Sequence, residues 1–160
     1  MDSTVAGVDW RQVVETLYRD DADRLWRAVR AFAGDPDIAS EAVAEAYAQA
    51  LRRGPVVRDP AAWVWRASFR IAAGALKARG PERDLVAATD EHRDHYEDPD
   101  LLLALQRLPE SQRAAVILFY YADLPIGQIA SRLGSNALAV RANLSRGRKR
   151  LRELLGDGDV

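Results

Sequence analysis

A short segment near the C-terminus has the pattern of two helices joined by a tight turn. Pro125 suits the first turn of a helix, because its missing N–H has no intrahelical partner there. Ala130 is small enough for a close helix crossing, Gly134 tolerates the left-handed dihedrals of a turn, and Val140 can plug the contact from the second helix. This spacing predicts a helix-turn-helix, whose two helices cross at a steep angle.

The second helix of this pair has one apolar side and a basic remainder, and Ser135 or Asn136 can cap it. Its apolar positions recur at spacings of four and three, at Val140, Leu144, Gly147, Leu151 and Leu154. The basic side chains that fall largely elsewhere are Arg141, Arg146, Arg148, Lys149, Arg150 and Arg152. Guanidinium groups bind phosphates and the acceptor edge of guanine, so the pattern favours nucleic-acid binding. The alternative is an ordinary solvated amphipathic helix.

Composition indicates a folded protein without disulfides. Of the 160 residues, 48% are hydrophobic and none is cysteine. No apolar run reaches the length that crosses a bilayer. The N-terminus lacks the basic start and apolar core of a secretion signal. We therefore expect a cytoplasmic protein with no membrane association.

Charge is distributed unevenly along the chain, although the net charge is only −1. Residues 1–79 hold twelve Lys or Arg against eleven Asp or Glu, residues 80–100 hold two against eight, and residues 101–160 hold nine against five. The acidic middle has few apolar residues and no sustained period, as in a flexible tether. The sequence therefore predicts an all-α protein with two small helical domains, 1–79 and 101–160, joined by an acidic linker over 80–100.

Helix signals recur in both predicted domains. Asp9 can cap the first helix, and Gly34 and Gly54 follow the first two. We expect helices over about 10–33, 37–53, 61–77, 101–107 and 109–121, followed by the helix-turn-helix pair.

The third helix carries aromatic and basic residues within two turns, at Trp63, Trp65, Arg66, Phe69 and Arg70. Proteins that hold unpaired bases stack them on aromatic rings and bind the backbone with cations. The alternative is that these rings are core residues of a small helical domain, which the pattern alone leaves open for Trp63 and Trp65.

Few residues suit catalysis or metal binding. Glu41 and Glu45 lie one turn apart on an exposed edge, and His92 and His95 lie in the acidic segment without a cysteine nearby. The sequence has no phosphate-cradling glycine loop and no nucleophile elbow, and neither predicted domain holds a histidine. We expect no enzyme activity, no metal site, no cofactor and no small-molecule substrate.

The order of these parts resembles the sigma-70 family of bacterial RNA polymerase factors, in its extracytoplasmic-function (ECF) group. That group keeps only conserved regions 2 and 4, joined by a tether. Residues 108–118, 124–134 and 140–152 resemble successive pieces of region 4. Residues 37–47 are similar to the helix that grips the polymerase clamp, and residues 60–66 to the start of the helix that reads the melted −10 element. The likeness covers almost the whole chain.

The resemblance implies a role for each set of residues. The recognition helix would lie in the major groove near −35, with Arg141, Asn136 and Asn143 at base edges and Ser145, Arg146, Arg148 and Lys149 completing the DNA-binding set. Trp65, Arg66, Phe69 and Arg70 would capture −10 bases. Glu41, Glu45 and Gln49 would bind polymerase, whose clamp and flap are the implied contacts. Members of this family commonly have an anti-sigma partner, although no segment of this sequence indicates one.

The chain departs from the family pattern in region 2 and in the recognition helix. Ala44 stands in place of a Gln, Arg70 and Gly74 replace an Asn and an Asp, and Ala139 replaces a Thr. A divergent promoter is one reading of these changes. The alternative functions are a stand-alone helix-turn-helix regulator, and a sigma-like protein that binds polymerase or an antagonist without melting promoters.

Overall fold

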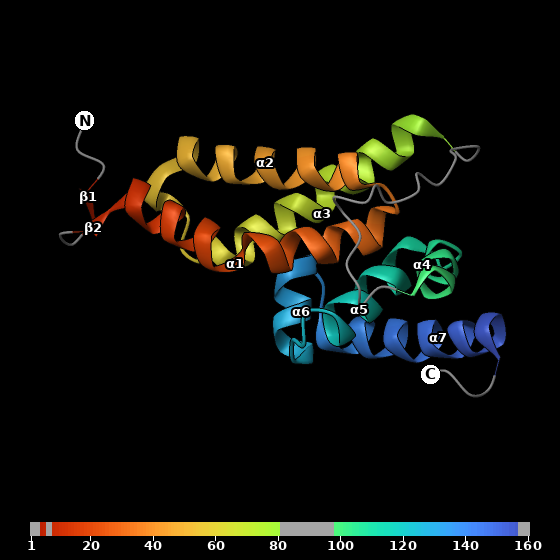
Figure 1. The fold of residues 1–160 in the computed structure, drawn as a ribbon. Coiled ribbons are helices and arrows are strands. Elements are labelled where there is room, and N and C mark those ends of the chain that lie inside the picture. The colour runs from red at the N-terminus through yellow and green to blue at the C-terminus, as the bar shows by residue number, and fades with distance from the viewer. Residues whose placement is uncertain (1–3, 6–7, 81–97, 157–160) are drawn as a thin grey trace.

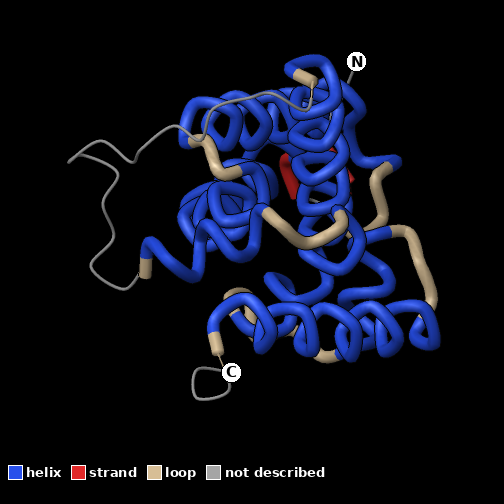
Figure 2. Tube along the Cα trace, turned by 90° about the vertical axis from the view of Figure 1, so that its right-hand side faces the viewer, coloured by secondary structure: helices blue, strands red, loops and turns tan. Residues whose placement is uncertain are grey.

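The computed structural model describes residues 4–5, 8–80 and 98–156, and these residues are almost entirely helical. A small antiparallel ribbon of β1 (Thr4–Val5) and β2 (Val8–Asp9) precedes the helices. The helices are α1 (Trp10–Ala33), α2 (Pro36–Arg53), α3 (Pro60–Arg79), α4 (Pro99–Gln106), α5 (Glu110–Tyr120), α6 (Ile126–Leu133) and α7 (Ala137–Leu155), with a 3-10 turn at Gly54–Val56. Figure 2 shows helices throughout, apart from the ribbon and the connecting loops. The predicted all-α class is confirmed.

Aspartates start the first four helices. Asp9, Asp35, Asp59 and Asp98 each accept a hydrogen bond from a backbone N–H in the first turn of the helix that follows. A proline follows the last three of these aspartates, where its fixed φ suits the first helical position. Helix α4 accordingly begins at Pro99, inside the predicted linker rather than after it. Residues 81–97 of that linker, which include His92 and His95, lie outside the described residues.

The helices form two layers (Figure 1). Helices α1, α2 and α3 pack on one another in the first layer, and α4, α5 and α6 pack on α7 in the second. The layers meet where α3 contacts α6 and where α1 contacts α4 and α5. The division into domains at 1–79 and 101–160 stays a prediction.

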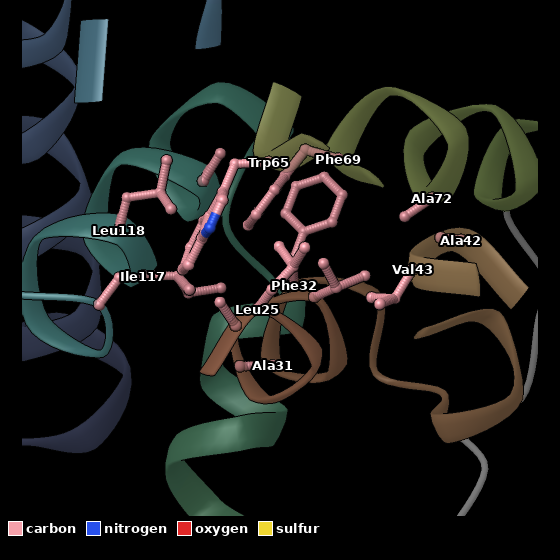
Figure 3. Close-up of a cluster of buried hydrophobic side chains, with 14 of the residues drawn as sticks. Leu25, Ala31, Phe32, Ala42, Val43, Trp65, Phe69, Ala72, Ile117 and Leu118 are labelled. Atoms are coloured by element: carbon pink, nitrogen blue, oxygen red, sulfur yellow. The ribbon is translucent and has the colours of Figure 1, made fainter. Parts of the chain in front are cut away.

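Buried side chains from both layers form one continuous cluster. Phe32 of α1 and Phe69 of α3 lie with ring centroids 5.0 Å apart, and Trp65 lies parallel to Phe69 at 6.5 Å. Figure 3 shows these three rings in the same cluster as Ile117 and Leu118 of α5. The core of the described chain therefore runs across the junction between the two layers.

Two glycines lie inside helices for different reasons. Gly147 of α7 is buried against α5, and a Cβ there would lie 2.7 Å from Cγ2 of Val116. Gly74 of α3 is exposed, and a Cβ there would have no neighbour within 4 Å. Only Gly147 is therefore required by the packing.

We predict that Gly147→Ala and Gly74→Ala change stability in opposite directions. An alanine in an open helix interior removes backbone entropy from the unfolded chain, so Gly74→Ala should stabilise by about 0.5–1 kcal/mol. In Gly147→Ala the contact with Val116 opposes that gain, so we expect a net loss of about 1–3 kcal/mol. Urea unfolding followed by circular dichroism measures both, and a more stable Gly147→Ala variant would contradict the close α5–α7 contact.

Candidate nucleic-acid interface

The helix-turn-helix has the predicted geometry. Gly134 ends α6 in the left-handed conformation, at φ 65° and ψ 38°. The N–H of Ser135 then donates to the carbonyl of Ala130 over 2.8 Å, which closes the turn. Ala130 and Val140 are both buried where α6 and α7 meet. The observed turn and the burial of these residues are consistent with the three predicted packing positions.

The recognition helix α7 separates its apolar and basic sides as the spacing predicts. Val140, Leu144, Gly147 and Leu151 are buried. The candidate DNA contacts that lie exposed are Asn136, Arg141, Ser145, Arg146 and Lys149, and those that lie half-buried are Asn143 and Arg148. Most of the predicted set is therefore accessible to phosphates and base edges.

Two of these side chains are already engaged within the protein. Asn136 caps α7, since its Oδ1 accepts from the N–H of Ala139 over 2.9 Å. The Nη1 of Arg148 donates to the hydroxyl of Tyr120 on α5 over 3.2 Å. A contact to DNA from either side chain competes with these bonds, which makes Arg141 and Arg146 the more available donors.

The candidate −10 residues of α3 differ in their exposure to solvent. Arg66 and Arg70 are exposed, whereas Trp65 is fully buried and Phe69 is 5% exposed. Trp65 Nε1 donates to Asp21 of α1 over 2.6 Å, so the ring is held by a hydrogen bond as well as by packing. In this conformation both rings belong to the core, and the role of Trp65 and Phe69 in capturing −10 bases stays a prediction.

The candidate polymerase-binding residues lie along one side of α2. Glu41 and Glu45 are exposed and Gln49 is half-buried. Glu45 Oε1 accepts from Gln49 Nε2 over 3.1 Å and from Arg52 Nη2 over 2.9 Å. These hydrogen bonds hold the pKa of the Glu45 carboxyl below its usual value, so it stays ionised. Glu45 is therefore a fixed negative charge that a basic partner surface could meet.

The described residues hold no cluster suited to a metal and no helix suited to a bilayer. Three or more His, Asp or Glu side chains do not gather anywhere within 4–5, 8–80 or 98–156 in a way that could hold an ion. None of the helices in those ranges combines the length and the apolarity required to cross a membrane.

Comparison with known proteins connects this geometry to a family. Residues 99–151 match the family model for sigma-70, region 4, and this span holds α4 to α6 and most of α7. The chain is also 28% identical over 158 residues to RNA polymerase sigma factor SigV of Bacillus subtilis (strain 168), covering 94% of this chain and 95% of that protein. The chain is similar to sigma-70 factors of the ECF group.

Other ECF sigma factors show the same full-length relationship. The ECF RNA polymerase sigma factor SigK of Mycobacterium sp. (strain KMS) is 27% identical, over 91% of this chain and 88% of its own length. Among solved structures, the sigma factor RpoE of Bartonella quintana, in complex with the anti-sigma factor NepR, matches with a TM-score of 0.71 at 21% identity, covering 94% of this chain and 99% of that one. CnrH, in complex with the cytosolic domain of CnrY, matches at a TM-score of 0.68 and 18% identity, over 93% and 91% of the two chains. The fold is therefore that of an ECF sigma factor along nearly its whole length.

Sequence reasoning missed the side chains that join the two layers. Arg132 of α6 lies with Cζ 4.9 Å from the centroid of the Trp65 ring. Arg113 of α5 is buried, with Cζ 4.8 Å from the centroid of Phe32. Gln106 Nε2 donates to the carbonyl of Ala31 over 2.7 Å. No local pattern could have indicated these residues, because each meets a partner more than sixty positions away in the chain.

We predict that Asn136 acts first as a cap. Asn136→Ala should lower the free energy of unfolding by about 1 kcal/mol, because the N–H of Ala139 loses its acceptor. Asn136→Ser keeps a side-chain oxygen at the same position and should stay within about 0.5 kcal/mol of the parent. Chemical denaturation of the three proteins in the absence of DNA makes the comparison. Equal stability of the alanine and serine variants would show that the side chain of Asn136 does not stabilise the start of α7.

Proposed function

We propose that the chain is an ECF sigma factor, which binds core RNA polymerase and directs it to promoters. The observation that carries the proposal is the complete helix-turn-helix with its exposed basic recognition helix, in a chain that matches ECF sigma factors over almost its full length. Helix α7 would enter the major groove near −35, with Arg141 at base edges and Arg146 and Lys149 on phosphates. The chain works in the cytoplasm, and the chemistry of RNA synthesis belongs to the polymerase, so the chain itself is not an enzyme.

Region 2 would supply the other two contacts. Helix α2 would meet the polymerase clamp through Glu41, Glu45 and Gln49, and the second layer would meet the flap. Helix α3 would meet the melted −10 strand through Arg66 and Arg70, which are exposed, while Trp65, which is buried and hydrogen-bonded to Asp21, would have to leave the core before it could stack on a base. Because unpaired bases cost a few kcal/mol to extrude and stacking returns a comparable amount, such contacts stabilise melting rather than force it.

An anti-sigma protein is the third partner in the proposal. RpoE of Bartonella quintana was solved in complex with the anti-sigma factor NepR, and this chain shares its fold over nearly the full length. That likeness supports an antagonist that holds the free chain away from polymerase.

Transcription in vitro with purified bacterial core polymerase tests the proposal. Templates carry a randomised promoter region, and the transcripts made with and without the chain are sequenced. A sigma factor produces starts that depend on both the chain and the core enzyme. A stand-alone regulator would bind its site without polymerase, and a sigma-like protein without promoter activity would bind core enzyme but yield no new starts.

We predict that Arg141→Ala changes the −35 sequences recovered in this assay. Loss of one base-edge contact is worth about 1–3 kcal/mol of discrimination at the base pair concerned. The matched control is Arg152→Ala, an exposed arginine of α7 that lies outside the candidate set and should leave the sequence preference unchanged. An unaltered −35 preference in Arg141→Ala would remove that residue from base readout.

We predict that Glu45→Ala weakens binding to core polymerase about tenfold, since a hydrogen-bonded charged group at an interface contributes about 1.5–3 kcal/mol. Glu15→Ala removes an exposed carboxylate from α1 and serves as the control. Fluorescence anisotropy of the labelled chain, titrated with core enzyme, gives both dissociation constants. Equal constants for Glu45→Ala and the parent chain would place the clamp contact elsewhere.

A further inference from the structure

The first turn of the recognition helix offers DNA an apolar surface. It begins with Ala137, Leu138 and Ala139, and none of these side chains carries a hydrogen-bond donor or acceptor. Asn136 precedes them, but its Oδ1 already accepts from the N–H of Ala139. The N-terminal residues of a recognition helix are the ones that contact base edges. The first turn of α7 therefore has no polar side chain of its own with which to read a base.

Leu138 is the large side chain of this turn, and it is 78% exposed. Single exposed leucines are common on protein surfaces, so the exposure alone does not indicate a function. The two neighbouring residues are alanines, which are both half-buried and too short to cover an isobutyl group. The side chain of Leu138 thus projects from the start of α7 into solvent.

The outer face of α7 carries Leu138 together with candidate DNA contacts. Arg141 and Ser145 follow Leu138 at spacings of three and seven residues, which place the three side chains on one side of a helix, and all three are exposed. The buried residues Val140 and Leu144 lie on the other side. Helices α4, α5 and α6 pack on α7, and in Figure 1 they lie above it. A groove that receives Arg141 therefore also receives Leu138.

The spacing of these two side chains matches the spacing of base pairs. Residues three apart on a helix are separated by about 4.5 Å along its axis and by about 5–6 Å between Cβ atoms. Successive base pairs of DNA are about 3.4 Å apart. Leu138 would therefore lie one or two base pairs from the base pair that Arg141 contacts.

The chemistry of leucine restricts what it can recognise. Every base pair presents donors or acceptors in the major groove, and thymine adds its C5-methyl group. A leucine placed on a donor or acceptor removes water from it without replacing the hydrogen bond, which is unfavourable. A leucine placed on the methyl group buries apolar surface of both partners, which is favourable. Both effects select thymine.

We propose that Leu138 is a specificity-determining residue of α7, which recognises the C5-methyl group of a thymine within two base pairs of the base pair that Arg141 contacts. This inference deepens the proposed function and rests on it. It adds one apolar contact to a helix whose other candidate DNA contacts are all polar or charged.

Replacement of single thymines by deoxyuridine tests the contact, because deoxyuridine lacks only the C5-methyl group and keeps the same hydrogen bonds. Randomised duplex DNA is selected for binding to the full chain with core polymerase and, in parallel, to the full chain alone. Each thymine of the best-bound duplex is then replaced in turn. Fluorescence anisotropy gives dissociation constants for the parent chain, Leu138→Ala and Leu103→Ala. Leu103 is an exposed leucine of α4 and provides the matched control.

At one thymine, loss of the methyl group should weaken binding of the parent chain about threefold to fivefold, as expected for one buried methyl group. Leu138→Ala should bind the unmodified duplex more weakly by a similar factor and should respond less than about 1.5-fold to deoxyuridine, because the two deletions remove the same contact. Leu103→Ala should behave like the parent chain. Alanine has the highest helix propensity, so Leu138→Ala should fold, and circular dichroism verifies this.

Three results would overturn the role of Leu138. The first is a parent chain that loses no affinity at any thymine, or whose selected duplex contains none. The second is an equal response to deoxyuridine in the parent chain and Leu138→Ala. The third is a Leu138-dependent thymine more than two base pairs from the position at which Arg141→Ala alters the preference.

The same measurements separate this inference from the proposed function. New transcription starts that depend on the chain and on core polymerase, without any Leu138-dependent methyl effect, would refute the role of Leu138 alone. A Leu138-dependent methyl effect in DNA binding by the chain alone, with no new starts when core polymerase is added, would refute the proposed function alone. If Leu138→Ala weakens binding to core polymerase while its response to deoxyuridine equals that of the parent chain, Leu138 contacts protein rather than DNA.

Discussion

The packing of Phe32, Phe69 and Trp65 holds the described chain together, because these three rings join α1 to α3 and extend the core to α5. A ring buries more apolar area than any aliphatic side chain, and offset or tilted pairs add a further favourable contact. The cluster also explains the placement of Arg113, which is buried at the layer junction and covers the Phe32 ring. The two layers therefore meet in part through aromatic surfaces that cations cover.

Local rules account for the helices and for the helix-turn-helix. Asp9 caps α1 and Gly134 takes the left-handed conformation as their positions in the sequence predict, since both effects involve only neighbours in the chain. The exposed side of α7 likewise follows from a period of 3.6 residues. These features give the fold class and the recognition helix without knowledge of any long-range contact.

The burial of Trp65 could not be predicted in the same way. Its position on α3 fits either a stacking platform or a core residue, and the choice depends on Asp21 and Arg132, which come from distant parts of the chain. Arg148 shows the same limit, because its bond to Tyr120 depends on how α5 lies against α7. The candidate site was thus predictable where one helix forms it, and only in part where two layers meet.

Gly147 of α7 and Val116 of α5 compete for the same packing space, because the two helices approach closely there. Val116 fills the space that a side chain at 147 would need. The region 4 core can therefore exchange side-chain volume between the two helices, but the total volume cannot increase. The residues that are tolerated at either position therefore depend on the residue at the other. A larger residue at 147 is expected in homologues only together with a smaller one at 116. Such a paired exchange would keep the arginines of the recognition helix at an unchanged distance from the first turn of α5.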